Sequence, residues 1–544
     1  MFRTKRRKVF LALGVLCLYL LGRAWFVFGP PGERATITIS KETTFITEPL
    51  KADGRPDYLR AINEKLSAGV TPENNGAVLF FQAIGPKDVS PELRTRFFAM
   101  LGMPVPPEDG PYFVGWRKII EKLKSDPGVQ GDKKILDSLE YELTIRPWTA
   151  DQYPTVADWL KTNEVPLDVL VKASRKPQFY LPLVGGNGDG ITLSEHFPDI
   201  ITFRDVVQAF LTRSMFNLQQ GKVADAWDDL FVARRLARFV GCGPSGMNRL
   251  AEFAYDQATI TVMLCVLHDP RCDAPMIARM KADVATLPIT RPFVDRIDSL
   301  ERLSALDAAI YIADAGLMHI SGPITFDDNQ ISSFLHRRVV NAGIDWDETL
   351  RVYNSCFDRL IEVYSMPEGP KKQAAQTEFR LWSNGLKNDV VSAMVVFAAV
   401  MPLPNLRSAN GRRAANVLLS MRMSGYNHFF VQETRAKVIA QMTDVAFALA
   451  SYRVDNGDYP DKLDALVPKF IPSLPNDPFS TGPFLYRRTD DCYVIYSVGP
   501  DGKDGGGEQF DSKEHPGSDD IALWAGKKPV PPKKPDPPAD ENSN

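Results

Sequence analysis

Cysteine is scarce in this chain, with six residues in 544, and their spacing excludes the usual roles of clustered thiols. Cys17 lies in an apolar run near the N-terminus, and the other five are scattered between positions 242 and 492. An odd, widely spaced set without a CxxC motif is neither a disulfide scaffold nor a zinc site. Buried free thiols are the expected state of these residues, and a link between Cys265 and Cys272 across a helix end in an oxidising compartment is the alternative.

Histidine is equally scarce, and the motifs of the common catalytic classes are absent. The six histidines are isolated, without HExxH or a cysteine at metal-ligand spacing. The glycine-rich stretch Gly185–Gly190 lacks the GK[ST] of a P-loop, and the chain has no GxSxG motif. Carboxylate pairs such as Asp228–Asp229 and Asp327–Asp328 are adjacent in sequence and point apart on a helix, although distant carboxylates could still build a glycosidase-like site. The sequence leaves enzymatic activity open and favours a non-catalytic protein.

Neither sign of charge dominates the chain. The net charge is −3, so no strong field attracts nucleic acid. The apolar content of 44% and the charged content of 24% are ordinary for a globular protein. A length of 544 residues exceeds what one hydrophobic core organises, so two or three domains are expected.

The N-terminus carries the clearest signal of where in the cell the protein is located. Residues 1–8 contain five Lys or Arg residues, and Val9–Gly22 follows without a charge. Arg23 and Trp25 suit the outer interface of a membrane, and Gly29–Pro31 ends any helix. We therefore predict a single transmembrane helix over 9–29, with residues 1–8 in the cytoplasm and the bulk outside the cytoplasmic (inner) membrane. A cleaved signal peptide is the alternative.

Residues 32–111 form a mixed segment. Ala35–Leu50 is rich in Thr and Ile and alternates as a short strand would. Asp57–Ser67 and Asn75–Ile84 read as helices, and Glu73–Gly76 supplies the turn and cap between them.

Residues 112–420 are expected to form a helical domain. Its clearest pair is Arg204–Gln219 and Val223–Val240, and another helix starts near Met247. Small residues recur on one face of the second helix, which favours a close helical hairpin as in tetratricopeptide-like repeats. The helices of this segment do not recur at a strict period. An irregular helical domain is therefore the main prediction, and a regular solenoid is the alternative.

Two further segments differ from this pattern. Asp389–Met401 is strongly apolar but too short to span a bilayer, so we expect a buried core helix, with a membrane-touching helix as the alternative. Residues 529–544 are rich in Pro, Lys and Asp and are expected to form a disordered tail.

The C-terminal part, 431–524, is the most informative stretch. Val438, Met442, Val445, Leu449 and Tyr452 form one apolar stripe of a helix that ends at Asn456-Gly457. Two strands are predicted next, Phe484–Arg488 and Cys492–Ser497, joined as a hairpin. A Gly/Asp-rich loop follows and runs as far as Asp519–Trp524. The fold class is therefore mainly α, with a transmembrane helix at the N-terminus and a small α+β head at the C-terminus.

The order of these blocks resembles one known family. A helix followed by YRVDNGDYP, LDALVP, LPNDPF, YSVGPDGKDGGG, DDI and a Trp is similar to the head of the major pseudopilin of type II secretion systems (protein G). The resemblance implies a long helix packed on a small antiparallel sheet, with a last loop that binds calcium. Carried over, the family's calcium site falls on the carboxylates of Asp501 and Asp520, the carbonyls of Val498 and Lys503, and the further positions Ser518 and Asp511.

The residue chemistry of this loop agrees with a calcium site. Calcium takes six to eight oxygens from carboxylates and carbonyls, and glycines let a loop wrap around it. Without an ion, the clustered aspartates would repel one another. A solvated acidic loop remains the alternative. Extra residues over Ser512–Pro516 disturb the alignment around Asp511.

The N-terminus departs from the pseudopilin pattern, which begins with a cleavage-site Gly, a Phe and an apolar helix carrying Glu at its fifth position. Lys8–Ala12 has neither the Gly-Phe start nor the Glu. The chain is therefore not expected to be processed or to polymerise as a pilin. We predict a membrane-anchored, extracytoplasmic, non-catalytic interaction protein of the bacterial cell envelope, with a calcium-stabilised head and a secretion-system or envelope protein as partner. The alternatives are an extracytoplasmic hydrolase with its site in the helical domain and a purely structural envelope protein.

Overall fold

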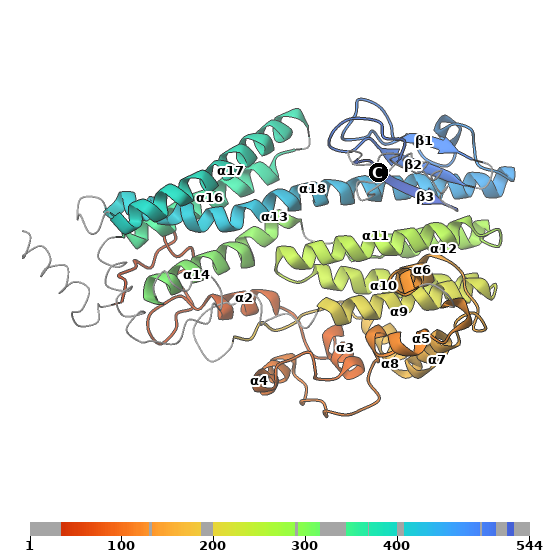
Figure 1. Cartoon of the computed structure of the whole chain (residues 1–544), viewed down its shortest axis with the longest axis horizontal. Coiled ribbons are helices and arrows are strands. Elements are labelled where there is room, and N and C mark those ends of the chain that lie inside the picture. Colours follow the sequence, from red (N-terminus) through yellow and green to blue (C-terminus); the bar gives the residue numbers. More distant parts are fainter. Residues whose placement is uncertain are drawn as a thin grey trace, which may run out of the picture.

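The computed structural model describes residues 34–129, 133–185, 200–288, 292–315, 344–367, 369–399, 407–489, 492–507 and 519–526. The described chain is mainly helical, as predicted, and carries a small antiparallel sheet of three strands near its C-terminus. The molecule is elongated, and the sheet lies toward one end (Figure 1). Several predicted features lie outside the described residues, namely the tail 1–8, the anchor 9–29, the glycine-rich residues 186–190, the pair Asp327–Asp328 and the Pro-rich tail 529–544.

The buried apolar residues form two large cores, and the first one joins most of the N-terminal half of the chain to the sheet. The helices that contribute to the first core are α3 (Gly76–Ile84), α4 (Pro91–Leu101), α5 (Ile120–Leu123), α6 (Lys133–Ile145), α7 (Pro154–Thr162), α8 (Glu164–Ser174), α9 (Ile200–Gln219), α10 (Val223–Gly241), α11 (Gly246–His268) and α12 (Ala274–Ala285), with short 3-10 turns at Trp116–Lys118 and Pro127–Val129. Among the described helices, α11 has the length and hydropathy to cross a membrane, and half of its apolar window is buried inside the protein.

The predicted helical hairpin is present as α9 and α10. Gly221, with φ +79°, makes the turn that reverses the chain, a conformation that glycine adopts without strain. Ala226, Ala233 and Ala237 are completely buried on α10, so the two helices approach closely. The helix predicted near Met247 stacks next as α11, which confirms this part of the helical domain.

The second core lies at the other end of the molecule (Figure 1). It is formed by α2 (Tyr58–Leu66), α13 (Phe293–Arg296), the π-helical turn Ile297–Glu301, α14 (Arg302–Ala315), α16 (Trp346–Ser365), α17 (Pro370–Ala399) and the first half of α18 (Arg407–Asn456). Residues 389–399 of the predicted apolar run lie in the last turns of α17.

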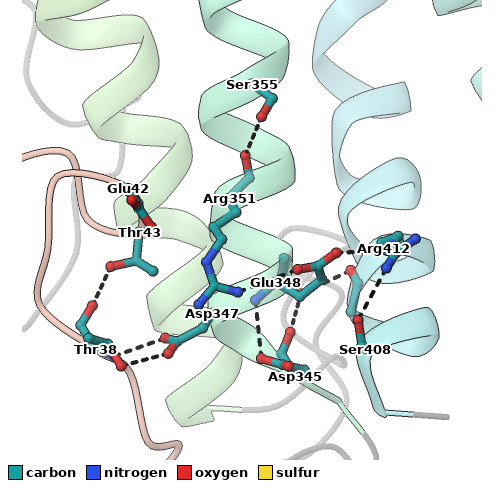
Figure 2. A network of polar contacts seen from close by, with 12 residues as sticks. Thr38, Glu42, Thr43, Asp345, Asp347, Glu348, Arg351, Ser355, Ser408 and Arg412 are labelled. Carbon is teal, nitrogen blue, oxygen red and sulfur yellow. Dashed lines mark hydrogen bonds and ion pairs between the residues drawn. The ribbon is translucent and has the colours of Figure 1, made fainter.

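The strand predicted over Ala35–Leu50 is wrong, because these residues form turns that lie against the second core. The hydroxyl of Thr44 donates to the carbonyl of Ser40 at 2.9 Å, which is a local alternative to a strand ladder. Thr38 binds the carboxylate of Asp347 through its backbone N–H at 2.9 Å and its hydroxyl at 2.6 Å (Figure 2). These contacts fasten the N-terminal segment to the start of α16.

Helix α18 spans both cores and is 50 residues long. Ala415, Leu419 and Met423 of its first half are buried in the second core. Val438 and Met442 of its second half are buried in the first core. The boundary proposed from sequence between the helical domain and the C-terminal module, at 420–431, therefore falls inside one continuous helix.

The sheet packs beside the end of α18. That helix ends at Asn456 as predicted, and Gly457 follows with φ +86°. The strands are β1 (Leu485–Arg488), β2 (Tyr493–Ser497) and β3 (Ile521–Ala525), in the order β1-β2-β3. The hairpin β1-β2 confirms the prediction, with Leu485 opposite Tyr496. The segment read as the end of a loop is instead the strand β3, which pairs antiparallel with β2.

Candidate functional site

The acidic loop predicted to bind a cation connects β2 to β3 and is described on both sides of residues 508–518. Gly499 has φ +68°, and a Cβ at this position would lie 2.3 Å from the carbonyl oxygen of Asp519. Glycine is therefore required for the turn after β2 to approach the start of β3. This close approach brings Asp501 next to Asp519.

Asp501 and Asp519 lie next to each other in the loop. The backbone N–H of Asp501 donates to Oδ2 of Asp519 at 3.1 Å, and Oδ1 of Asp501 accepts from the N–H of Lys503 at 2.9 Å. The pKa of the Asp519 carboxyl is raised by burial, then by a side-chain hydrogen bond and charge repulsion from Asp501. Two carboxylates that lie this close together form a local excess of negative charge.

Asp520 has a structural part in addition to the one that the resemblance implies. Its side chain is buried, and its two oxygens accept from the N–H groups of Gly505 at 3.3 Å and Gly507 at 2.7 Å. Burial raises the pKa of its carboxyl, and the two hydrogen bonds oppose that rise. Asp520 therefore holds the glycine-rich turn in place, whether or not it also contacts an ion.

The structure brings together only part of the predicted ligand set. Asp501 and Asp520 lie in the same loop, whereas Asp511 and Ser518 lie outside the described residues. The part of the chain that the structure describes contains no group of three or more His, Cys, Asp or Glu side chains placed to hold a metal ion. The donors nonetheless fit a hard cation, because Asp501 and Asp519 offer two mutually repelling carboxylates. Asp519, which lies next to Asp501, was not in the ligand set that the resemblance implied.

A second buried aspartate stabilises the end of β2, where the acidic loop begins. Asp477 accepts from the hydroxyl of Ser497 at 2.7 Å, from the N–H of Val498 at 3.1 Å and from the N–H of Phe479 at 3.0 Å. These three bonds fix the end of β2, where the predicted calcium-binding carbonyl of Val498 is located. Asp477 lies in the block LPNDPF, but nothing in the sequence marked it as buried.

A cavity of about 1010 Å³ lies where the head meets the helical body, lined by α6, α11, the end of α18 and β3. His268 Nδ1 and the hydroxyl of Tyr459 lie 3.0 Å apart on its wall. Arg453 donates to the carbonyls of Leu267, His268 and Asp269, so it caps the C-terminus of α11.

Two titratable groups that line this cavity stay protonated at neutral pH. Burial raises the pKa of the Cys265 thiol to about 11 and that of Tyr459 to about 12, so both stay protonated. Cys265 and Cys272 are free thiols, in line with the main expectation from sequence; Cys272 is buried and Cys265 partly buried. Elsewhere in the body, Asp228 and Asp229 point apart as predicted, to Arg279 and Arg213 respectively.

Comparison with known proteins identifies the C-terminal module. Residues 430–513 match the family model described as type II secretion system (T2SS), protein G. The match begins within α18 and ends in the acidic loop, so it covers the helix, β1, β2 and the turn at Gly499. Searches of curated proteins and of solved structures return no match to this chain. The pseudopilin resemblance inferred from sequence is confirmed for this module, which is a minority of the chain.

Proposed function

We propose that this protein is a non-catalytic interaction protein, anchored in the inner membrane by residues 9–29, that holds a protein G-like head outside the cytoplasm. Its partner would be a component of a secretion assembly or another envelope protein. The family match supports the identity of the head, and the basic, then apolar, N-terminus supports the anchor and its orientation.

The observation that carries this proposal is the way in which α18 is packed. The pseudopilin resemblance implies a long helix that leads into the head. Here the first half of that helix lies in the second core, packed against α16 and α17. A helix buried inside its own chain is not available for packing in a filament. The head is therefore a fixed module on a helical body and not the end of a polymerising subunit.

Calcium is proposed as the ion of the acidic loop. Asp501 and Asp519 would supply carboxylate oxygens, and the carbonyls of Val498 and Lys503 would lie in the same turn. A bound cation would relieve the repulsion that raises the pKa of Asp519. The expected role of the ion is to fix the loop, because calcium sites of this kind order the backbone that surrounds them.

A purely structural role is the second candidate, and the shared core favours it. Leu449 of α18, Tyr493 of β2 and Met263 of α11 all belong to the first core. The head therefore covers an apolar face of the body, and it would be needed for folding even without a partner.

Site-specific photo-crosslinking in the native host distinguishes the two roles. A photoreactive residue would be placed at the exposed head positions Lys462 and Asp464, with exposed Val165 of the body as the control. The interaction role predicts adducts with an identified secretion or envelope protein from the head positions and not from the control. If the head gives no adducts, or if both regions give the same ones, the structural role remains.

A further inference from the structure

The cavity between the head and the helical body is built from distant parts of the chain. Residues of α6, α9, α11, the end of α18 and β3 line it, and its volume is about 1010 Å³. Strand β3 lies beside α11 and the end of α18, so the cavity exists only because the head is packed on the body (Figure 1). Ligand sites occur preferentially at such junctions, with volumes of roughly 300–1,000 Å³.

The inner part of this cavity is apolar and uncharged. Leu218, Leu264 and Leu523 are buried residues of its wall. The thiol of Cys265, whose pKa is raised to about 11 by burial, stays neutral and donates to the carbonyl of Ile145 at 3.3 Å. A wall of this kind gains free energy by covering an apolar group of a ligand.

The mouth of the cavity offers neutral hydrogen-bonding groups. Tyr141 lines the cavity and is 56% exposed, so the cavity reaches the surface of the protein. Among the described residues, neither the hydroxyl of Tyr141 nor the side-chain amide of Gln257 has a hydrogen-bond partner. Both groups can donate and accept, as the backbone of a peptide also does.

The charged side chains of the wall are already paired within the protein. Asp269 and Asp458 form ion pairs with arginines, and Arg146 binds Glu142 at 3.0 Å. Arg453 donates to the carbonyls at the C-terminus of α11. A charged ligand would therefore lose its hydration in the cavity without meeting an unpaired counter-charge, which favours a neutral ligand.

We propose that this cavity binds a neutral peptide segment of a partner protein, whose aromatic side chain enters the leucine-lined inner part. The inference deepens the proposed interaction role and rests on it. The aromatic side chain would pack on the leucines, with the rings of Tyr141 and Trp524 beside it, and the backbone of the segment would bind at the mouth. A saccharide would instead place hydroxyls against the leucines, and a hydrocarbon chain would leave the polar groups of the mouth without partners.

Thr261 of α11 allows the cavity to be filled without breaking a contact between elements. It lies on the wall, and its hydroxyl donates to the carbonyl of Gln257 in its own helix at 3.1 Å. Thr261→Phe would therefore take the space of the ligand. The hydroxyl of Thr377 on α17 makes the same kind of bond, to the carbonyl of Gln373 at 2.9 Å, and this residue is exposed outside the cavity. Thr377→Phe is the matched control.

Binding of defined probes to the full-length protein tests the inference. The probe is the capped peptide acetyl-Gly-Gly-Trp-Gly-Gly-amide, titrated in ligand-observed NMR with saturation transfer from the protein. The same peptide with Ala or Lys in place of Trp reports the need for a neutral aromatic side chain, and cellotriose represents a saccharide. The thermal unfolding midpoint of each variant shows whether it is folded.

We expect saturable binding of the Trp peptide with a Kd of about 1 mM or tighter, and at least about tenfold weaker binding of the Ala and Lys peptides. Thr261→Phe should abolish binding of the Trp peptide, and Thr377→Phe should leave it unchanged. Gln257→Leu, which keeps the size of the side chain and removes the amide, should weaken it about fivefold.

Three results would each overturn the inference: equal binding of the three peptides, binding of the Trp peptide that persists in a folded Thr261→Phe variant, and binding of cellotriose alone. Failure of every probe to bind would overturn it as well. The interaction role itself would then still be decided by the photo-crosslinking from Lys462 and Asp464, so the two failures are distinguishable.

Discussion

At the scale of single residues, the acidic loop shows two ways of keeping a carboxylate in a fold. Asp520 and Asp477 are buried and receive hydrogen bonds from N–H or hydroxyl groups, which replace the water that they lose. Asp519 faces another carboxylate, that of Asp501, and its pKa is raised. In the first arrangement the hydrogen bonds oppose the cost of burying a carboxylate, whereas in the second the neighbouring carboxylate adds to that cost unless a cation is present.

The pair Asp501 and Asp519 makes stability depend on pH and calcium. Because the folded-state pKa of Asp519 is raised, its contribution is fully present below its unfolded pKa of about 4 and is lost as the pH rises through the folded value. In chelator, the midpoint of thermal unfolding should therefore fall as the pH rises from about 4 toward neutral. Calcium at about 100 times its Kd should restore about 2.7 kcal/mol at the higher pH.

Asp519→Asn provides the control for that experiment. It should remove much of the pH dependence in chelator, and Asp501→Ala should abolish the stabilisation by calcium. The exposed Asp464→Asn on the same head should change neither. A calcium effect that persists in Asp501→Ala would place the ion elsewhere, and no calcium effect in the wild-type protein would support the solvated-loop alternative.

At the scale of elements, α18 is the feature that organises the molecule. Its second half carries the apolar stripe Val438, Met442, Val445 and Leu449, all completely buried. Its first half packs in the other core with small residues. Gly411 is needed there because a Cβ would lie 2.4 Å from the carbonyl of Asp345. One uninterrupted helix therefore couples the position of the head to that of the body.

Ala436 lies in α18 between the two cores. A break of the helix at this position would separate its two halves. Ala436→Pro removes a helical hydrogen bond and introduces a clash, which costs about 3 kcal/mol or more. We expect new proteolytic cleavage near this position and a lower unfolding midpoint. Ala436→Gly is the control, since it costs about 1 kcal/mol without blocking the hydrogen bond. If the proline variant resisted protease as well as the wild-type protein does, the continuous helix would not be the element that couples the head to the body.

Regular amphipathic elements were predictable from sequence, and elements set by tertiary contacts were not. The helices near 58–66, 76–84 and 223–241, the end of α18 at Asn456 and the β1-β2 hairpin follow from their periods and turn residues. The start of α18 at Arg407 was missed, because Gly411 and the polar residues around it give a weak helical signal. Strand β3 is short and almost wholly buried, so it shows no alternation. In the loop, the pairing of Asp501 with Asp519 depends on the turn at Gly499.

At the scale of the whole molecule, the head and the body are not independent units. The first core runs from α3 through α11 and α12 to α18 and the sheet. Arg453 adds three hydrogen bonds to the end of α11 across the same junction. A separate domain would instead have its own core and a boundary that few contacts cross. The pseudopilin-like module is therefore built into the body, and its orientation relative to the body is fixed by packing.

Because the first core is continuous across the junction, a destabilising substitution on one side should also destabilise the other side. Leu449 of α18 is completely buried in the first core, so Leu449→Ala should cost about 2–5 kcal/mol. Native-state hydrogen exchange should show the same loss of protection in β2 and in α11, because both unfold with this core. Leu419→Ala, at an equally buried position of the second core, should affect α16 more than β2. If Leu449→Ala lowered protection in β2 and left α11 unchanged, the head would be a separate domain after all, attached to the body by α18 alone.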